Sequence, residues 1–164
     1  MIPFIDLSSQ FKRIQTEVEE RVISVLRSGQ YILGPEVSEF EDKLAEFAKV
    51  KHVISCSSGT DALIIALMAK GIGPGDAIFT TPFTYFATAE VIALLGATPI
   101  FVDINISTFN IDPSALKSAI LSLKQYDTSN NALPKWSLER LRSLSPKGII
   151  TVDLFGLPAD HDQI

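Results

Sequence analysis

Short apolar segments alternate with helical patterns along the last two thirds of the chain. The apolar segments are expected to be strands and span residues 52–56, 77–81, 98–104 and 148–154. Strands that are apolar on both sides need helices on both faces of their sheet, and the intervening helices permit parallel pairing. The pattern therefore predicts an α/β protein with three α/β/α layers and a mostly parallel sheet. Ligands bind beyond the carboxyl ends of such strands, so the turns after the four segments are the candidate sites.

The helices of this pattern have recognisable ends. Two amphipathic helices are expected before the alternation, one over about 9–27 with Gly29 as its stop and one after the Gly34-Pro35 turn. Further helices are expected over 60–70 and about 84–95, the second stopped by Gly96. Another begins at Asp112-Pro113, where a capping residue precedes a proline in the first turn.

The stretch 124–146 interrupts the regular pattern and is polar. Asn130-Asn131 is typical of a turn, and residues 137–144 carry a short helical motif. We interpret this stretch as a surface insertion. Its single tryptophan, Trp136, is expected to hold the insertion against the body of the protein, since a large aromatic side chain usually serves packing.

Composition excludes several classes of protein. The 164 residues are 46% hydrophobic, which suits a globular core, and the net charge of −5 disfavours nucleic acid as the main partner. No segment reaches the roughly 18 apolar residues of a membrane span, and the N-terminus lacks a signal-peptide pattern. The one cysteine, Cys56, is expected to be a small buried residue, and no metal-ligand spacing surrounds His52 or His161. These features favour the cytoplasm.

The turn from Ser57 to Asp61 places small hydroxyl residues and a glycine where a helix begins. Backbone N–H groups are unpaired there and the helix dipole favours an anion, so the turn can cradle a phosphate. Each charge-assisted hydrogen bond to that phosphate can contribute about 1.5–3 kcal/mol. The same residues also fit a capping box that needs no ligand and contributes roughly 1 kcal/mol. Both interpretations remain open at this point.

Several blocks in this order resemble the DegT/StrS-type sugar aminotransferases, which are pyridoxal-phosphate (PLP) enzymes of fold type I. The blocks are SSGTDALIIAL (57–67), GIGPGDAIFTTPFTYFATAEVIALLGATPIFVDI (71–104), TFNIDPSAL (108–116) and VDLFGLPADHDQI (152–164). The opening blocks IPFIDLSSQF and GQYILGPEVSEFEDKLAEF match as well. The resemblance implies an aspartate aminotransferase-like large domain that is incomplete at its C-terminus. It predicts an N-terminal helical segment over 1–50 and the first part of the PLP-binding domain over 51–164.

The resemblance also implies roles for particular residues. The cofactor phosphate would lie on the turn that contains Ser58, Gly59 and Thr60, with Asp61 beside it. The ring of Tyr85 would stack on the cofactor, since stacked rings gain roughly 0.5–1.5 kcal/mol beyond area burial.

The neighbours of Tyr85 in the same turn, Phe83 and Phe86, are expected to be core residues. Tyr31 would contact the substrate. The resemblance places the Schiff-base lysine and the acid that holds the pyridine nitrogen protonated beyond residue 164, so no catalytic residue is assigned in this chain.

The implied function is transfer of an amino group from an amino acid, glutamate being expected, to a keto sugar attached to a nucleotide, in surface polysaccharide or amino-sugar biosynthesis. A homodimer is expected for the full-length protein. Two alternatives remain: a PLP- or PMP-dependent sugar dehydratase of the same family, and a non-catalytic fragment or regulator that keeps the fold.

Overall fold

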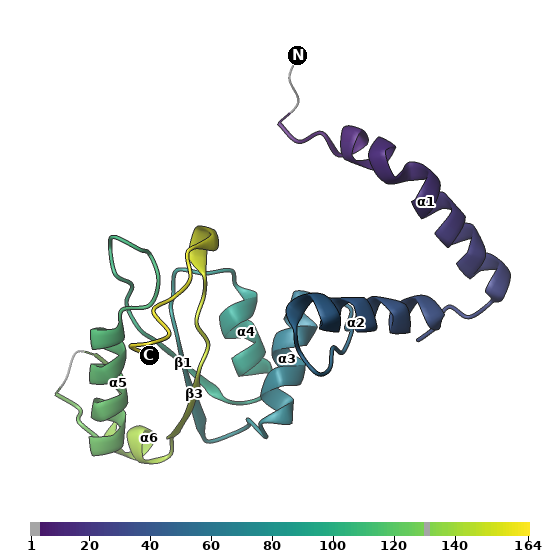
Figure 1. The fold of residues 1–164 in the computed structure, drawn as a ribbon. Helices are drawn as coiled ribbons and strands as arrows, with labels where there is room; N and C mark the ends of the chain where they lie inside the picture. Colours follow the sequence, from purple (N-terminus) through teal and green to yellow (C-terminus); the bar gives the residue numbers. More distant parts are fainter. Residues whose placement is uncertain (1–3, 130–131) are drawn as a thin grey trace. The chain divides into compact units, whose positions relative to one another are not determined.

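The computed structural model describes residues 4–129 and 132–164, and Figure 1 shows its two compact units. The first unit ends at Ser55 and the second runs from Cys56 to Ile164. The predicted Asn130-Asn131 turn lies outside the described residues. In the described part of the chain, no helix is both long and apolar enough to span a bilayer.

The first unit consists of helices α1 (Leu7–Ser28) and α2 (Pro35–Ala48), as the sequence predicts. Gly29 ends α1 in the left-handed conformation, and Gly34 with Pro35 begins α2. Arg21 of α1 pairs with Glu36 and Glu39 of α2, each at 2.6 Å. Among the described residues of this unit, no side chain of either helix is fully buried. Their apolar faces are therefore left without a core of their own.

The second unit is built on a parallel sheet of β1 (Asp76–Thr80), β2 (Thr98–Phe101) and β3 (Ser145–Ile149). Its order is β2-β1-β3, so β1 is central and is nearly all buried. Side chains alternate along β1: Ala77 and Phe79 enter one core cluster, while Ile78 enters another. This alternation follows the two-residue period of a strand and requires a cover on each face.

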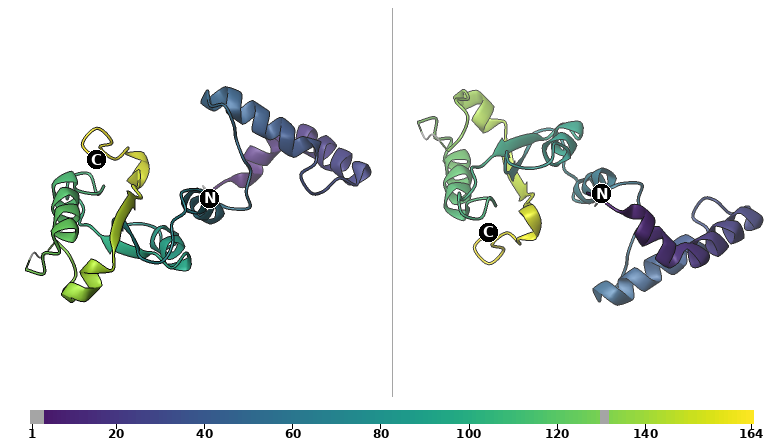
Figure 2. Two further views of the ribbon diagram at one scale, coloured as in Figure 1. Left: turned by 90° about the horizontal axis from the view of Figure 1, so that it is seen from below. Right: turned by 90° about the horizontal axis from the view of Figure 1, so that it is seen from above.

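Helices supply both covers. Helix α5 (Pro113–Gln125) packs on the face of Phe79, and α3 (Gly59–Ala69) with α4 (Ala87–Leu94) packs on the face of Ile78. Figures 1 and 2 show α5 and α4 on opposite faces of the sheet. The predicted α/β class, the parallel sheet and the helices on both of its faces are thus confirmed for this unit. Asp112 caps α5 by accepting from the N–H groups of Ser114 and Ala115 at 2.7 and 3.0 Å.

Two predictions at the start of the second unit are wrong. Residues 52–56 form no strand in the described part of the chain, and Cys56 is exposed, with its thiol donating to the Ser58 carbonyl at 3.3 Å. An apolar sequence favours a strand, but the strand forms only where a neighbouring strand pairs with its backbone groups. None of the three described strands pairs with this segment.

The insertion is better anticipated by the sequence. It contains helix α6 (Leu138–Arg142), which is capped by the Ser137 hydroxyl. Trp136 packs against the cluster beneath α5, as predicted, and the Arg140 guanidinium lies 5.7 Å from its ring centroid. Strand β3 begins three residues earlier than expected, at Ser145, and residues 154–156 form the 3-10 helix η1 (Leu154–Gly156).

Candidate functional site

The N-terminus of α3 is the best-formed anion site that the sequence predicts. Ser58 is the N-cap, and its hydroxyl oxygen accepts from the Asp61 N–H at 3.1 Å. The next two N–H groups, those of Gly59 and Thr60, lie in the first turn, where a helix offers no carbonyl partner. They are therefore available to an acceptor outside the helix, and the helix dipole favours a negative one.

The backbone at Gly59 is not covered by other described residues. A Cβ added at Gly59 would meet no described atom within 4 Å, so nothing blocks the backbone at that position. A bulky anion can approach the Gly59 amide to hydrogen-bond distance only where no side chain intervenes. The donor set of two backbone amides and the Thr60 hydroxyl is the chemistry that binds phosphate, and Ser58 shapes the turn as its N-cap.

Asp61 lies in the same turn but is engaged locally. Its carboxylate accepts from the hydroxyls of Ser57 and Ser58, the second at 3.1 Å. The side chain thus reaches back toward the start of the helix, as a capping residue does. The capping interpretation therefore holds for Ser58 and Asp61, while the amides of Gly59 and Thr60 stay free for the phosphate interpretation.

Tyr85 follows β1, in the loop that leads to α4, and its side chain is 81% exposed. The loop is held by hydrogen bonds: the Phe83 N–H donates to the Thr81 hydroxyl oxygen at 3.1 Å, and the Tyr85 carbonyl accepts from the Thr88 N–H at 3.1 Å. An exposed ring on a fixed loop is available to stack on a ligand. The expectation that Phe83 and Phe86 are core residues is wrong, since both are exposed. Their apolar character does not bury them because the loop lies beyond the end of the sheet.

Two carboxylates lie beyond the carboxyl ends of β2 and β3. Asp103 accepts from the Ile104 N–H at 2.8 Å, and Asp153 accepts from the Ala159 N–H at 2.9 Å. The His161 Nε2 lies 3.7 Å from Asp153. Each carboxylate thus holds its own loop in place. Among the described residues, no group of three or more potential ligands could hold a metal ion.

Asn110 is a structural residue that the sequence did not single out. It lies in the loop after β2, is 3% exposed, and makes two hydrogen bonds to the segment after β3. Its Nδ2 donates to the Leu157 carbonyl at 2.8 Å, and its Oδ1 accepts from the Leu154 N–H at 3.1 Å. The side chain therefore brackets η1 and fixes one carboxyl-end loop to another.

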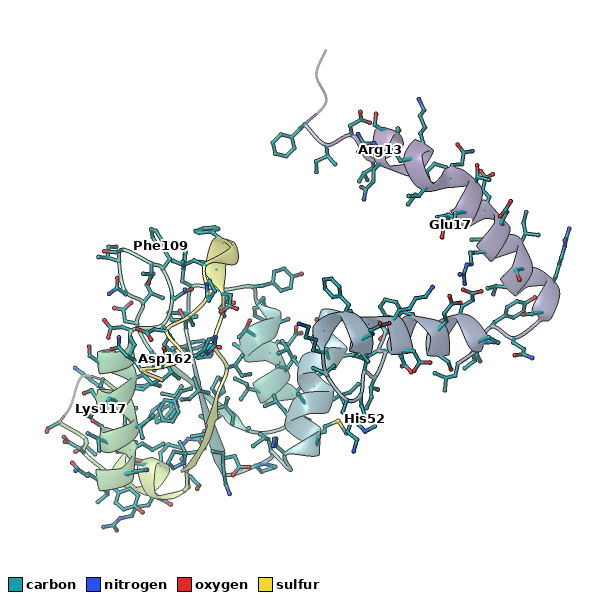
Figure 3. All side chains as sticks on the ribbon, in the orientation of Figure 1. Arg13, Glu17, His52, Phe109, Lys117 and Asp162 are labelled. Atoms are coloured by element: carbon teal, nitrogen blue, oxygen red, sulfur yellow. The ribbon has the colours of Figure 1, made fainter. Side chains whose placement is uncertain are left out.

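A cluster of three phenyl rings, Phe83, Phe109 and Phe155, lies at the same end of the sheet. Figure 3 shows Phe109 on the loop beside η1, beyond the carboxyl ends of the strands. Phe109 and Phe155 have positive φ angles of 60° and 55°, a conformation that costs a residue with a side chain roughly 1–2 kcal/mol. The sequence did carry a signal for this cluster, since each of the three strand-ending turns contains at least one phenylalanine.

Tyr31 belongs to the first unit. Its hydroxyl donates to the Leu26 carbonyl at 3.1 Å, which ties the segment after α1 to the last turn of that helix. The structure thus gives Tyr31 a local contact, and its predicted contact with the substrate stays a prediction.

Comparisons with known proteins place the chain in a family and agree with its fold. The profile of the DegT/DnrJ/EryC1/StrS aminotransferase family matches residues 12–164. The chain is 48% identical to the UDP-2-acetamido-2-deoxy-3-oxo-D-glucuronate aminotransferase of Pseudomonas aeruginosa over 164 residues, which are 100% of this chain and 40% of that protein. The chain therefore spans about two fifths of the length of such relatives.

Two solved structures show the same fold. A DegT DnrJ EryC1 StrS aminotransferase from Brucella abortus superposes with a TM-score of 0.86 at 44% identity, over 99% of this chain and 40% of that one. NtdA from Bacillus subtilis, solved with bound cofactor PMP, superposes with a TM-score of 0.76 at 29% identity, over 99% of this chain and 32% of that one.

Proposed function

The chain belongs to the DegT/DnrJ/EryC1/StrS aminotransferase family, and from this premise we propose that it is the N-terminal part of a PLP-dependent sugar aminotransferase. The substrate is a keto sugar attached to a nucleotide, and an amino acid, glutamate, supplies the amino group. A relative named for a UDP-linked 3-oxo sugar, 48% identical to this chain, supports that substrate class.

The open N-terminus of α3 carries the proposal. The amides of Gly59 and Thr60 and the Thr60 hydroxyl hold the cofactor phosphate, Ser58 caps the turn that presents them, and the ring of Tyr85 covers the pyridine face. Asp61 keeps the turn in shape through its bonds to the serine hydroxyls. The bound cofactor supplies an electron sink for transamination, and these residues bind and orient it.

We place the lysine that carries the reaction in the three fifths of the relatives' length that this chain does not cover. Lys43 pairs with Glu39 at 2.5 Å, and Lys70 is the C-cap of α3, at the end away from the phosphate cradle. Lys147 lies in β3, within the sheet rather than in a turn at its carboxyl end. We therefore expect no transamination from residues 1–164 alone.

The exposed apolar faces of the first unit support a homodimer of the full-length protein. Phe11, Ile14 and Val22 of α1 share one helix face and are each about half exposed. Contiguous exposed apolar side chains of this kind mark protein contacts. We place the dimer in the cytoplasm, in polysaccharide or other amino-sugar biosynthesis.

The phosphate cradle can be tested with one methyl group. Gly59→Ala adds a Cβ that meets no described atom, so the fold should be unaffected, but the methyl group stands where the phosphate approaches the backbone. Loss of one charge-assisted hydrogen bond, about 1.5–3 kcal/mol, predicts PLP binding weaker by roughly tenfold or more in the full-length protein. The measurement is titration with PLP, followed by visible absorbance.

Gly73→Ala is the matched control, because the added Cβ there meets its nearest atom, the Leu95 carbonyl oxygen, only at 3.9 Å. Equal PLP affinity in both variants and the unchanged protein would refute the cradle.

Borohydride reduction in the presence of PLP, followed by mass spectrometry, tests where the Schiff-base lysine lies. We expect one labelled lysine on the full-length protein and none on this chain. A label at one defined lysine of residues 1–164 would contradict it.

A further inference from the structure

The three loops at the carboxyl ends of the sheet each contribute one phenyl ring to a single cluster. Phe83 comes from the loop after β1, Phe109 from the loop after β2, and Phe155 from η1 after β3. The ring centroids of Phe83 and Phe109 are 5.7 Å apart and tilted by 37°, and those of Phe109 and Phe155 are 6.1 Å apart in an edge-on arrangement. Both spacings are those of interacting aromatic pairs.

The described residues do not bury this cluster. Phe83, Phe109 and Phe155 are 45%, 37% and 83% exposed, and all lie outside both core clusters. Two of the rings stand on left-handed backbone, which side chains usually avoid. Strained backbone persists where the surroundings impose it, and it is concentrated at ligand sites.

Asn110 imposes this conformation on the turn that bears Phe155. Its buried amide bonds to Leu154 and Leu157, the residues on either side of Phe155-Gly156. The Phe109 N–H in turn donates to the Asn105 carbonyl at 2.8 Å, which closes the loop after β2. The backbone segments that carry Phe109 and Phe155 are thus fixed by hydrogen bonds before any ligand binds.

We propose that the phenyl cluster stacks on the pyrimidine base of the nucleotide-linked sugar, a role distinct from that of Tyr85 and the phosphate cradle. The inference rests on the proposed function, because it takes a UDP-like substrate as its ligand. A pyrimidine is flat and uncharged, which suits exposed phenyl faces. The cluster offers no charged group to a diphosphate, so its contribution is to the base alone.

Stacking of this kind gives a measurable signature in the full-length protein loaded with PLP. Removing a stacked ring should weaken UDP binding about tenfold. Phe155→Gly removes the ring and relieves the left-handed backbone, so the variant has no reason to misfold. Inorganic pyrophosphate, which has no base, should bind the variant and the unchanged protein equally. Phe155→Tyr keeps a ring and should retain UDP affinity, whereas Phe155→Leu should lose it.

Tyr126→Gly is the matched control. Tyr126 is also an exposed aromatic residue on left-handed backbone, with φ of 56°, but it lies at the C-cap of α5 and contacts Arg142. This control should bind UDP normally. Unchanged UDP affinity in Phe155→Gly, or equal weakening of UDP and pyrophosphate, would overturn the inference.

The visible absorbance of bound PLP distinguishes failure of this inference from failure of the proposed function. A protein that binds PLP, as visible absorbance reports, but whose UDP affinity is independent of Phe155 refutes only the stacking. A protein that binds PLP and no UDP also refutes the stacking and leaves the cofactor site standing. Failure to bind PLP at all refutes the proposed function itself.

Discussion

Replacing Asn110 by alanine should destabilise the protein. The substitution removes a donor from the Leu157 carbonyl and an acceptor from the Leu154 N–H, at a side chain that is only 3% exposed. A polar group that loses its partner in a buried setting costs about 1–3 kcal/mol. Two such losses, one of them at the half-exposed residue Leu157, predict a decrease of about 2–4 kcal/mol in the free energy of unfolding.

The assay is denaturant unfolding, followed by circular dichroism, together with thermal melting. For a protein of this size the loss corresponds to a melting temperature lower by roughly 5–15 °C. Asn105→Ala is the matched control in the same loop, because Asn105 is exposed and its side chain accepts only a local bond from the Ser107 N–H at 2.9 Å. This control should lose less than about 1 kcal/mol.

A second variant isolates the donor half of the bracket. In the unchanged protein the Asn110 amide nitrogen lies 2.8 Å from the Leu157 carbonyl oxygen. Asn110→Asp keeps an oxygen for the Leu154 N–H but replaces that nitrogen by a carboxylate oxygen, which cannot donate to the Leu157 carbonyl. The loss should shrink at acidic pH, where a protonated carboxyl group can donate again. Surface substitutions usually change the free energy of unfolding by no more than about 0.5 kcal/mol. If Asn110→Ala changes it by no more than that, the two Asn110 hydrogen bonds contribute no stability and the reasoning is refuted.

Three further predictions concern the rest of the chain. The Arg21 guanidinium lowers the pKa of Glu39 from 4.5 to about 2. The ionised Glu39 therefore stabilises the protein fully above pH 4.5, and this stabilisation is lost as the pH falls toward 2. Glu39→Gln should flatten that part of an acid-unfolding curve, and an unchanged curve would contradict this. Asp112→Ala removes the cap of α5 and should cost about 1 kcal/mol in denaturant unfolding, whereas no loss would mean that the cap is dispensable. Gly96→Ala should cost at least about 1–2 kcal/mol in melting experiments, because φ is +76° and the new Cβ would lie 3.0 Å from Pro74 Cγ; a stable variant would show that the turn can relax.

Local signals in the sequence were sufficient to predict where the main helices begin and end. Gly29 ends α1, Asp112 and Pro113 begin α5, and Ser58 caps α3, because capping depends on the few residues around a helix end. The α/β alternation was also readable, since a doubly covered parallel strand is apolar throughout. The phosphate cradle at Gly59 could be proposed for the same reason: its donors are consecutive in the chain.

Tertiary structure decided everything that depends on a distant partner. Residues 52–56 have the composition of a strand, yet no described strand pairs with them, and Cys56 is exposed as a result. Phe83 and Phe86 are apolar but lie on a loop past the end of the sheet, where no layer covers them.

The Asn110 bracket joins residues more than forty positions apart, and the phenyl cluster joins three loops. Sequence by itself determined which segments become helices and which fold class they build, because periodicity and capping act over a few residues. Only the folded chain determined which segments pair and which rings meet, because parallel strands bring together carboxyl-end loops that are tens of residues apart in the sequence.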